Sequence, residues 1–215
     1  MAKILLVVPT LSSYEAFLSD FAEAVMAAGD EVHVATQLKL LDGRDVEEYL
    51  SIESGVQLHP ISMPRGSNPF VVLKAAKELR GLASKIQPDW IQAHFSAAAV
   101  VCALAKSSDW PFTSCVIHGL ACTLTRGKAR LAVWLGERLA MALLDEMWVL
   151  TEDDFEVIQD WDSSKARLQK SLGVGCRIDR FDRENYSADW RSDRRAELEI
   201  QPEECVLIYV GRLAS

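Results

Sequence analysis

Short apolar runs recur along the chain and alternate with longer stretches whose apolar residues have helical spacing. The runs are rich in Val, Ile and Leu and almost uninterrupted, as expected of strands whose two faces are both covered by helices. They occupy residues 4–8, 32–36, 56–61, 90–93, 114–117 and 147–150. This alternation predicts an α/β fold built on a doubly wound parallel sheet of about six or seven strands, ending near residue 169.

The stretches between the runs carry recognisable helix ends. Residues 14–28 have helical apolar spacing and stop at Gly29, a common helix terminator. Asn68 and Pro69 suit the N-cap and first position of another helix. The apolar face of that helix is predicted to comprise Leu73, Ala76, Leu79 and Leu82. Further helices are predicted over residues 96–106 and 129–144, and after Thr151, where three carboxylates follow the hydroxyl.

Composition excludes several classes of function. The 215 residues include 31 Asp and Glu against 23 Lys and Arg, and the net charge of -8 argues against DNA or RNA as a partner. The five cysteines are an odd number without a CxxC pair, which favours free thiols in a reducing compartment over disulfides or a zinc site. No stretch has signal-peptide features or the ~18 apolar residues that span a bilayer. We expect a cytoplasmic protein whose contact with a membrane is limited to its surface.

The character of the sequence changes toward its end. Residues 163–195 hold nine Lys and Arg against five Asp and Glu and show little helical periodicity before Trp190, which is typical of a solvated linker. Residues 206–213 have the pattern of a buried strand that runs into a glycine turn. The expected organisation is one domain over 1–170, a linker over 171–204, and over 205–215 the first strand of a second α/β domain at which the chain breaks off.

Polar side chains follow several predicted strands. Thr10, Ser12 and Ser13 come after the first strand, His94 after the fourth, and His118 after the fifth. Because the carboxyl ends of parallel strands share one edge of a sheet, and ligands bind there in open sheets, these side chains are predicted to lie close together at a binding site. His33 and His59, within or beside strands, are interpreted as structural.

The segment after His118 contains groups suited to a diphosphate. Gly119 allows the backbone to approach a ligand closely, and the next residues offer hydroxyls and cations just before a predicted helix. These groups are Thr123, Thr125, Arg126, Lys128 and Arg130. An exposed loop with ordinary surface charges remains the alternative. Neither a P-loop nor a GxGxxG motif occurs, so ATP or NAD binding through those motifs is not supported.

Six segments occur in an order and spacing that resemble glycosyltransferase family 4. They are residues 68–74, 88–95, 116–119, 137–139, 172–175 with 179–181, and 209–213. Enzymes of that family have the GT-B fold, retain the anomeric configuration, and in many cases build bacterial capsule, O-antigen, lipopolysaccharide or exopolysaccharide on lipid carriers. The resemblance implies the Rossmann-like, N-terminal, acceptor-binding half of such an enzyme.

The resemblance also implies roles for individual residues. His118 is similar to the strand-end histidine that faces the transferred sugar, and Arg212 to the arginine that neutralises the leaving diphosphate; these are the expected catalytic residues. The expected acceptor-binding residues are Thr10, Ser12, Ser13, His94, Gly119, Arg126 and Lys128. No metal and no cofactor are expected, because cations can stabilise the diphosphate and the nucleotide sugar is a substrate. Ser12-Ser13 departs from the Gly-Gly turn of many relatives.

The implied reaction is transfer of a hexosyl group from a nucleotide sugar to a saccharide acceptor, carried on a polyprenyl diphosphate, at the inner surface of the membrane. Residues 1–215 alone are expected to be inactive, because the donor-binding half supplies most donor contacts. Two alternatives stay open. One is a non-catalytic or split subunit that binds acceptor, membrane or a partner chain, and the other is a sugar-nucleotide epimerase with the same two-domain layout.

Overall fold

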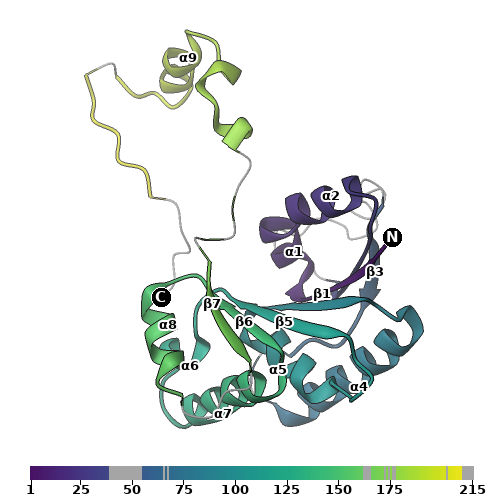
Figure 1. Ribbon diagram of the computed structural model, residues 1–215. Helices are drawn as coiled ribbons and strands as arrows, with labels where there is room; N and C mark the ends of the chain where they lie inside the picture. Colours follow the sequence, from purple (N-terminus) through teal and green to yellow (C-terminus); the bar gives the residue numbers. More distant parts are fainter. Residues whose placement is uncertain are drawn as a thin grey trace. The chain divides into compact units, whose positions relative to one another are not determined.

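The computed structural model describes residues 1–38, 55–64, 66, 68–161, 166–171, 173, 175, 178–201 and 203–209 of the chain. The chain divides into two compact units, residues 1–175 and 176–215 (Figure 1). Unit 1 contains a parallel sheet with helices on both faces, and unit 2 contains short helical segments.

In the part of unit 1 that the structure describes, the sheet has seven strands, all parallel, in the order β3-β2-β1-β4-β5-β6-β7. The strands are β1 (Lys3–Thr10), β2 (Glu31–Gln37), β3 (Gln57–Pro60), β4 (Trp90–His94), β5 (Phe112–Ile117), β6 (Glu146–Val149) and β7 (Arg167–Lys170). The doubly wound parallel sheet is therefore confirmed, and each of the six apolar runs forms a strand. The pattern did not locate β7, because a charged edge strand lacks an apolar run.

Two layers of helices cover the sheet (Figure 1). Side chains of α1 and α2 pack with Ile4, Leu6 and Val8 on one face. Those of α4, α5, α7 and α8 pack with Leu5 and Val7 on the other. The helices among the described residues of unit 1 are α1 (Leu11–Phe17), α2 (Ser19–Ala27), α4 (Pro69–Ile86), α5 (Phe95–Ala105), α6 (Ala121–Leu124), α7 (Lys128–Leu143) and α8 (Glu152–Gln159).

Two details of the helices differ from the sequence predictions. The single helix predicted over 14–28 is two helices that meet at Leu18, whose φ of -129° breaks the helical repeat. The break rotates the buried face, so Tyr14 and Leu18 are buried while Phe17 is exposed. Leu73, predicted on the buried face of α4, is also exposed. The cap of α4 is confirmed, since the Asn68 side chain accepts a hydrogen bond from the Phe70 amide.

The described residues of unit 2 form two 3-10 turns, Ile178–Phe181 and Arg183–Asn185, followed by α9 (Trp190–Glu197). Its rings of Tyr186 and Trp190 pack with centroids 4.7 Å apart. The predicted strand over 206–213 is not formed in its described part, 206–209, because a strand needs a hydrogen-bonded neighbour. Residues 210–215 lie outside the described residues, so the start of a second domain there stays a prediction.

Candidate functional site

Three strand ends bring polar side chains to one edge of the sheet. β1 ends at Thr10, β4 ends at His94, and β5 ends one residue before His118. The strand order reverses between β1 and β4, since β2 and β3 lie on one side of β1 and the later strands on the other. Open α/β sheets bind ligands in the crevice outside such a switch point, so this edge is the candidate site.

The rings of His94 and His118 are hydrogen-bonded to each other, which confirms that the two residues lie together. Nδ1 of His94 is 3.1 Å from Nε2 of His118, and Nε2 of His94 is 3.0 Å from Oε1 of Gln92. An amide oxygen only accepts hydrogen bonds, so a neutral His94 carries its proton on Nε2 and accepts at Nδ1. His118 then donates from Nε2, which makes its Nδ1 an acceptor.

Both histidines are held in the neutral form. Burial, with a smaller contribution from the adjacent His118, lowers the pKa of His94 from 6.5 to about 3. Burial also lowers the pKa of the less enclosed His118. Removal from water disfavours the charged imidazolium, and a second imidazole next to it adds to the penalty. At neutral pH the pair therefore offers hydrogen bonds rather than positive charge.

Two phenylalanines enclose the ring of His118. The Phe95 ring stacks on it with centroids 4.0 Å apart and an interplanar angle of 16°, and the Phe17 ring meets it edge-on at 5.1 Å. Phe95 has a φ of 71°, in the left-handed region that bulky residues rarely adopt. Strain of this kind persists where the surroundings impose it, and it is concentrated at functional sites. We call Gln92, His94, His118, Phe17 and Phe95 the histidine cluster.

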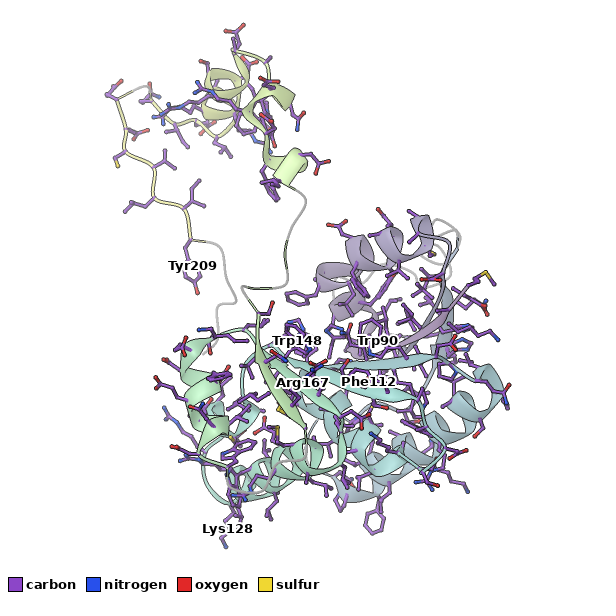
Figure 2. The ribbon with its side chains drawn as sticks, viewed as in Figure 1. Trp90, Phe112, Lys128, Trp148, Arg167 and Tyr209 are labelled. Atoms are coloured by element: carbon purple, nitrogen blue, oxygen red, sulfur yellow. The ribbon has the colours of Figure 1, made fainter. Side chains whose placement is uncertain are left out.

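A hollow of about 270 Å³ opens beside the histidine cluster. It is lined by Phe17, Leu18, Phe21, Gln92, His94, Val116, Trp148, Ser171 and Gly173. Trp148 of β6 lies on the same sheet face as His94, because His94 pairs with Val116 and Val116 with Trp148 across the strands (Figure 2). Aromatic walls with a few fixed polar groups are typical of small-molecule sites, although this hollow is near the lower end of their size range.

The polar residues after β1 serve first as a helix cap. The Thr10 hydroxyl accepts a hydrogen bond from the Ser13 amide at 3.1 Å, and the two hydroxyl oxygens are 2.9 Å apart. Thr10 is thus the N-cap of α1, and Ser12 and Ser13 lie in its first turn. The Ser12-Ser13 pair, noted above as a departure from the Gly-Gly turn of the family that the sequence resembles, forms helix. The acceptor-binding role predicted for these three residues stays a prediction.

A buried carboxylate holds the segment after His118. Glu137 of α7 is 1% exposed and accepts hydrogen bonds from the Ser96 hydroxyl at 2.5 Å and from the amides of Ala121 and Cys122 at 2.7 and 3.2 Å. It therefore joins the starts of α5 and α6, the helices that follow β4 and β5. These amides are paired within the protein, so they do not form an anion site.

A second carboxylate, that of Asp154, binds the same segment one residue earlier, at Leu120. Gly119 has a φ of 137°, and the amide of Leu120 then donates to Asp154 of α8 at 3.3 Å. The Asp154 amide in turn donates to Thr151, which confirms Thr151 as the N-cap of α8. The turn at Gly119 is thus tied to α8, which supports the position of the neighbouring His118.

The cations predicted near the site lie beside a different feature. The hydroxyls of Thr123 and Thr125 both donate at 2.7 Å to main-chain carbonyls three or four residues earlier, so the hydroxyl part of the predicted diphosphate cradle is not supported. Arg126 and Lys128 are exposed and flank a second hollow of about 630 Å³, the apolar groove. It is lined by Pro64, Gly66, Pro69, Val72, Leu73, Ser96, Ala97, Val100, Leu104, Ala121, Thr125, Ala129, Ala132, Val133, Gly136 and Glu137.

The two hollows share no lining residue. The structure thus brings His94 and His118 together at the sheet edge, next to Gly119, but places Arg126 and Lys128 beside the apolar groove. Arg212 lies outside the described residues, so its catalytic role stays a prediction. Within the described part of the chain, no group of three or more His, Cys, Asp or Glu side chains is arranged to hold a metal ion.

Sequence reasoning missed the neighbours that define the histidine cluster. Gln92 lies two residues before His94 on the same strand, so it points to the same sheet face, and this spacing was a usable signal. Phe95 follows His94 directly, but its unusual backbone conformation has no signature in the sequence. Phe17 was assigned to a buried helical face, which the break at Leu18 turns toward His118.

Comparisons with known proteins place this site in context. A family model described as the glycosyl transferase 4-like domain matches residues 14–169. Among solved structures, a sucrose-phosphate synthase from Thermosynechococcus elongatus is similar at a TM-score of 0.70 and 19% identity, covering 99% of this chain and 56% of that one. No curated protein sequence matches.

Two further structures share the fold at lower similarity. A glycosyltransferase from Rickettsia africae has a TM-score of 0.61 and 16% identity, covering 94% of this chain and 50% of that one. A UDP-N-acetylglucosamine 2-epimerase from Rickettsia bellii has a TM-score of 0.59 and 15% identity, covering 94% and 52%. The chain thus spans about half the length of these proteins. It belongs to the glycosyl transferase 4-like family and has the Rossmann-like fold found in GT-B glycosyltransferases.

Proposed function

We propose that this chain is the acceptor-binding half of a retaining glycosyltransferase that moves a hexosyl group from a nucleotide sugar to a saccharide acceptor. The observation that carries the proposal is the hydrogen-bonded pair His94 and His118 at the switch point of a glycosyl transferase 4-like sheet. The family match favours transfer over epimerisation, although epimerases share the fold.

In this proposal His118 contacts the sugar that is transferred. Its ring is neutral, its Nε2 is occupied by His94, and its Nδ1 is ready to accept a hydrogen bond from a sugar hydroxyl. The rings of Phe95 and Phe17 limit the access of water to the imidazole, which strengthens that hydrogen bond. His118 therefore orients the sugar, while charge on the leaving diphosphate is stabilised by cations such as Arg212.

The finer parts of the proposal concern the acceptor and the donor. The acceptor is a saccharide on a polyprenyl diphosphate in surface polysaccharide synthesis, and the chain acts at the inner surface of the membrane. Residues 1–215 alone bind a nucleotide sugar weakly, because a single ion pair between Arg212 and the diphosphate contributes about 1 kcal/mol or less, whereas millimolar affinity needs about 4 kcal/mol.

Sugar transfer by the chain joined to a donor-binding half, measured with labelled uridine and guanosine diphosphate sugars, tests the proposal. We expect His118→Ala to lower turnover by about 100-fold or more, while His59→Ala leaves turnover within about twofold of the parent. His59 is a suitable control because it also hydrogen-bonds a neighbouring histidine, at 2.9 Å, but from β3, away from the switch point.

Three outcomes of this experiment contradict the proposal. If His118→Ala retains most turnover, the histidine cluster is structural. If the nucleotide sugar is epimerised without an acceptor, the epimerase alternative holds. If acceptor binds but no donor is ever consumed, the chain is a non-catalytic subunit.

A further inference from the structure

Helices α4, α5 and α7 lie side by side on the face of unit 1 that carries the apolar groove (Figure 1). The groove is a furrow between their packed sides. Among its lining residues, Glu137 alone is ionisable, and that carboxylate is buried and hydrogen-bonded. The groove therefore offers an almost entirely apolar surface to whatever occupies it.

Further large apolar side chains are exposed on the helices that line the groove. Large apolar side chains on α4, α6 and α7 are between 54% and 82% exposed; they are Phe70, Leu73, Leu124, Leu131 and Leu135. Leu131 and Leu135 are four residues apart and so project from the same side of α7. The groove and these exposed side chains belong to the same helices and form an apolar surface of the kind that marks an interaction site. We call it the apolar face.

Positive charge lies beside the apolar face in an otherwise acidic protein. Residues 119–144, which include α6 and α7, contain four Lys and Arg and one acidic residue, the buried Glu137, whereas the whole chain has a net charge of -8. Arg126, Lys128 and Arg130 are exposed, and none is in an ion pair within the part of the chain that the structure describes. Lys128 points outward from the start of α7 (Figure 2).

We propose that the apolar face docks on the surface of an anionic lipid bilayer. Leu131, Leu135 and their neighbours enter the boundary between head groups and acyl chains, and the cations bind anionic head groups, the combination by which amphipathic surfaces bind membranes. A second copy of the chain fits less well, because a symmetric pairing of this face brings like charges together. None of the described helices has the length and apolar character of a membrane span.

This inference deepens the proposed function, on which it rests for the biological use of a lipid surface. The physical argument does not need sugar transfer, and the two are measured separately. Docking can therefore fail while the His118 experiment succeeds, and the reverse.

Flotation of the full chain with vesicles tests the docking surface. We expect binding to vesicles of phosphatidylglycerol and phosphatidylcholine, weakening as salt is raised, and little binding to phosphatidylcholine alone. Leu131→Glu with Leu135→Glu should lower the bound fraction at least about tenfold, and Arg126→Glu with Lys128→Glu similarly, since each cation near an anionic surface contributes about a fivefold change in affinity.

A matched control separates the apolar face from unit 2. Leu207 and Ile208 are 94% and 81% exposed in an apolar segment of unit 2, so Leu207→Glu with Ile208→Glu adds the same two charges elsewhere. We expect this control to keep vesicle binding. Equal loss in control and test variants, no loss in either, or no binding by the parent chain overturns the proposal. So does a dimer in sedimentation that Leu131→Glu dissociates without any vesicle binding.

Discussion

The histidine cluster and the apolar face of unit 1 differ in how far the protein itself provides partners for their side chains. In the cluster, buried polar groups are paired in a chain from Gln92 through His94 to His118. On the apolar face, large apolar side chains such as Leu131 remain exposed, although Leu5 and Val7 of the underlying sheet are fully buried. The first arrangement fixes one geometry, and the second leaves burial to be completed by a partner. Glu137 is related to both regions, since it lines the groove and hydrogen-bonds the segments that follow His94 and His118.

The largest effect is expected at Glu137. Glu137→Ala should lower the free energy of unfolding of unit 1 by about 3–4 kcal/mol, because the Ser96 hydroxyl and two amides lose their acceptor in a buried position. Glu137→Gln keeps one acceptor oxygen and should cost clearly less. Urea unfolding followed by tryptophan fluorescence measures both, and a loss below about 1 kcal/mol for Glu137→Ala would mean that Glu137 is not a link between the regions.

Stability should depend on pH through the histidine cluster. The folded-state pKa of His94 is lowered to about 3, so between pH 6.5 and 3 the unfolded chain binds a proton at His94 that the folded chain does not. The contribution of His94 to the free energy of unfolding is therefore fully present above pH 6.5. The free energy of unfolding falls with acidification, by about 1.4 kcal/mol per pH unit well below pH 6.5. In denaturant titrations, His94→Gln should reduce the difference in the free energy of unfolding between pH 6.5 and pH 4.5 by about 2 kcal/mol. An unchanged slope would show that His94 titrates normally.

A smaller effect on stability is expected at the exposed end of the cluster. His118→Ala removes a half-buried ring and its stacking on Phe95, which should cost about 1 kcal/mol. The fold should remain, so thermal unfolding of this variant serves as the folding control for the transfer experiment. A cost of 3 kcal/mol or more, comparable to buried aromatic truncation, would place His118 with the structural residues.

The smallest effect is expected on the apolar face. Leu131→Glu with Leu135→Glu should change the free energy of unfolding by within about 0.5 kcal/mol, because both side chains are more than half exposed and give up little buried area. Scanning calorimetry of these variants and of the parent measures this change, and the scans can be repeated with anionic vesicles present. Strong destabilisation without vesicles would show that the apolar face already packs within the protein.

Much of the fold followed from local patterns in the sequence. Buried parallel strands need uninterrupted apolar runs, and helix starts need particular caps, so the six runs, Asn68 and Thr151 were found from the residues alone. The proximity of His94 and His118 also followed, because parallel strands end on one edge of a sheet. These features depend on interactions between residues that are close in the sequence, or on the parallel topology that alternating strands and helices imply.

Only the tertiary structure decided the rest. The partners of His118, the exposure of Leu73 and Leu131, and the buried acceptor role of Glu137 depend on how helices are rotated against the sheet, as the break at Leu18 illustrates. A helical pattern shows that one face is apolar but does not show what that face meets. The apolar pattern of α7 therefore predicted a helix, while packing in three dimensions decided which of its leucines reach the core and which remain at the surface.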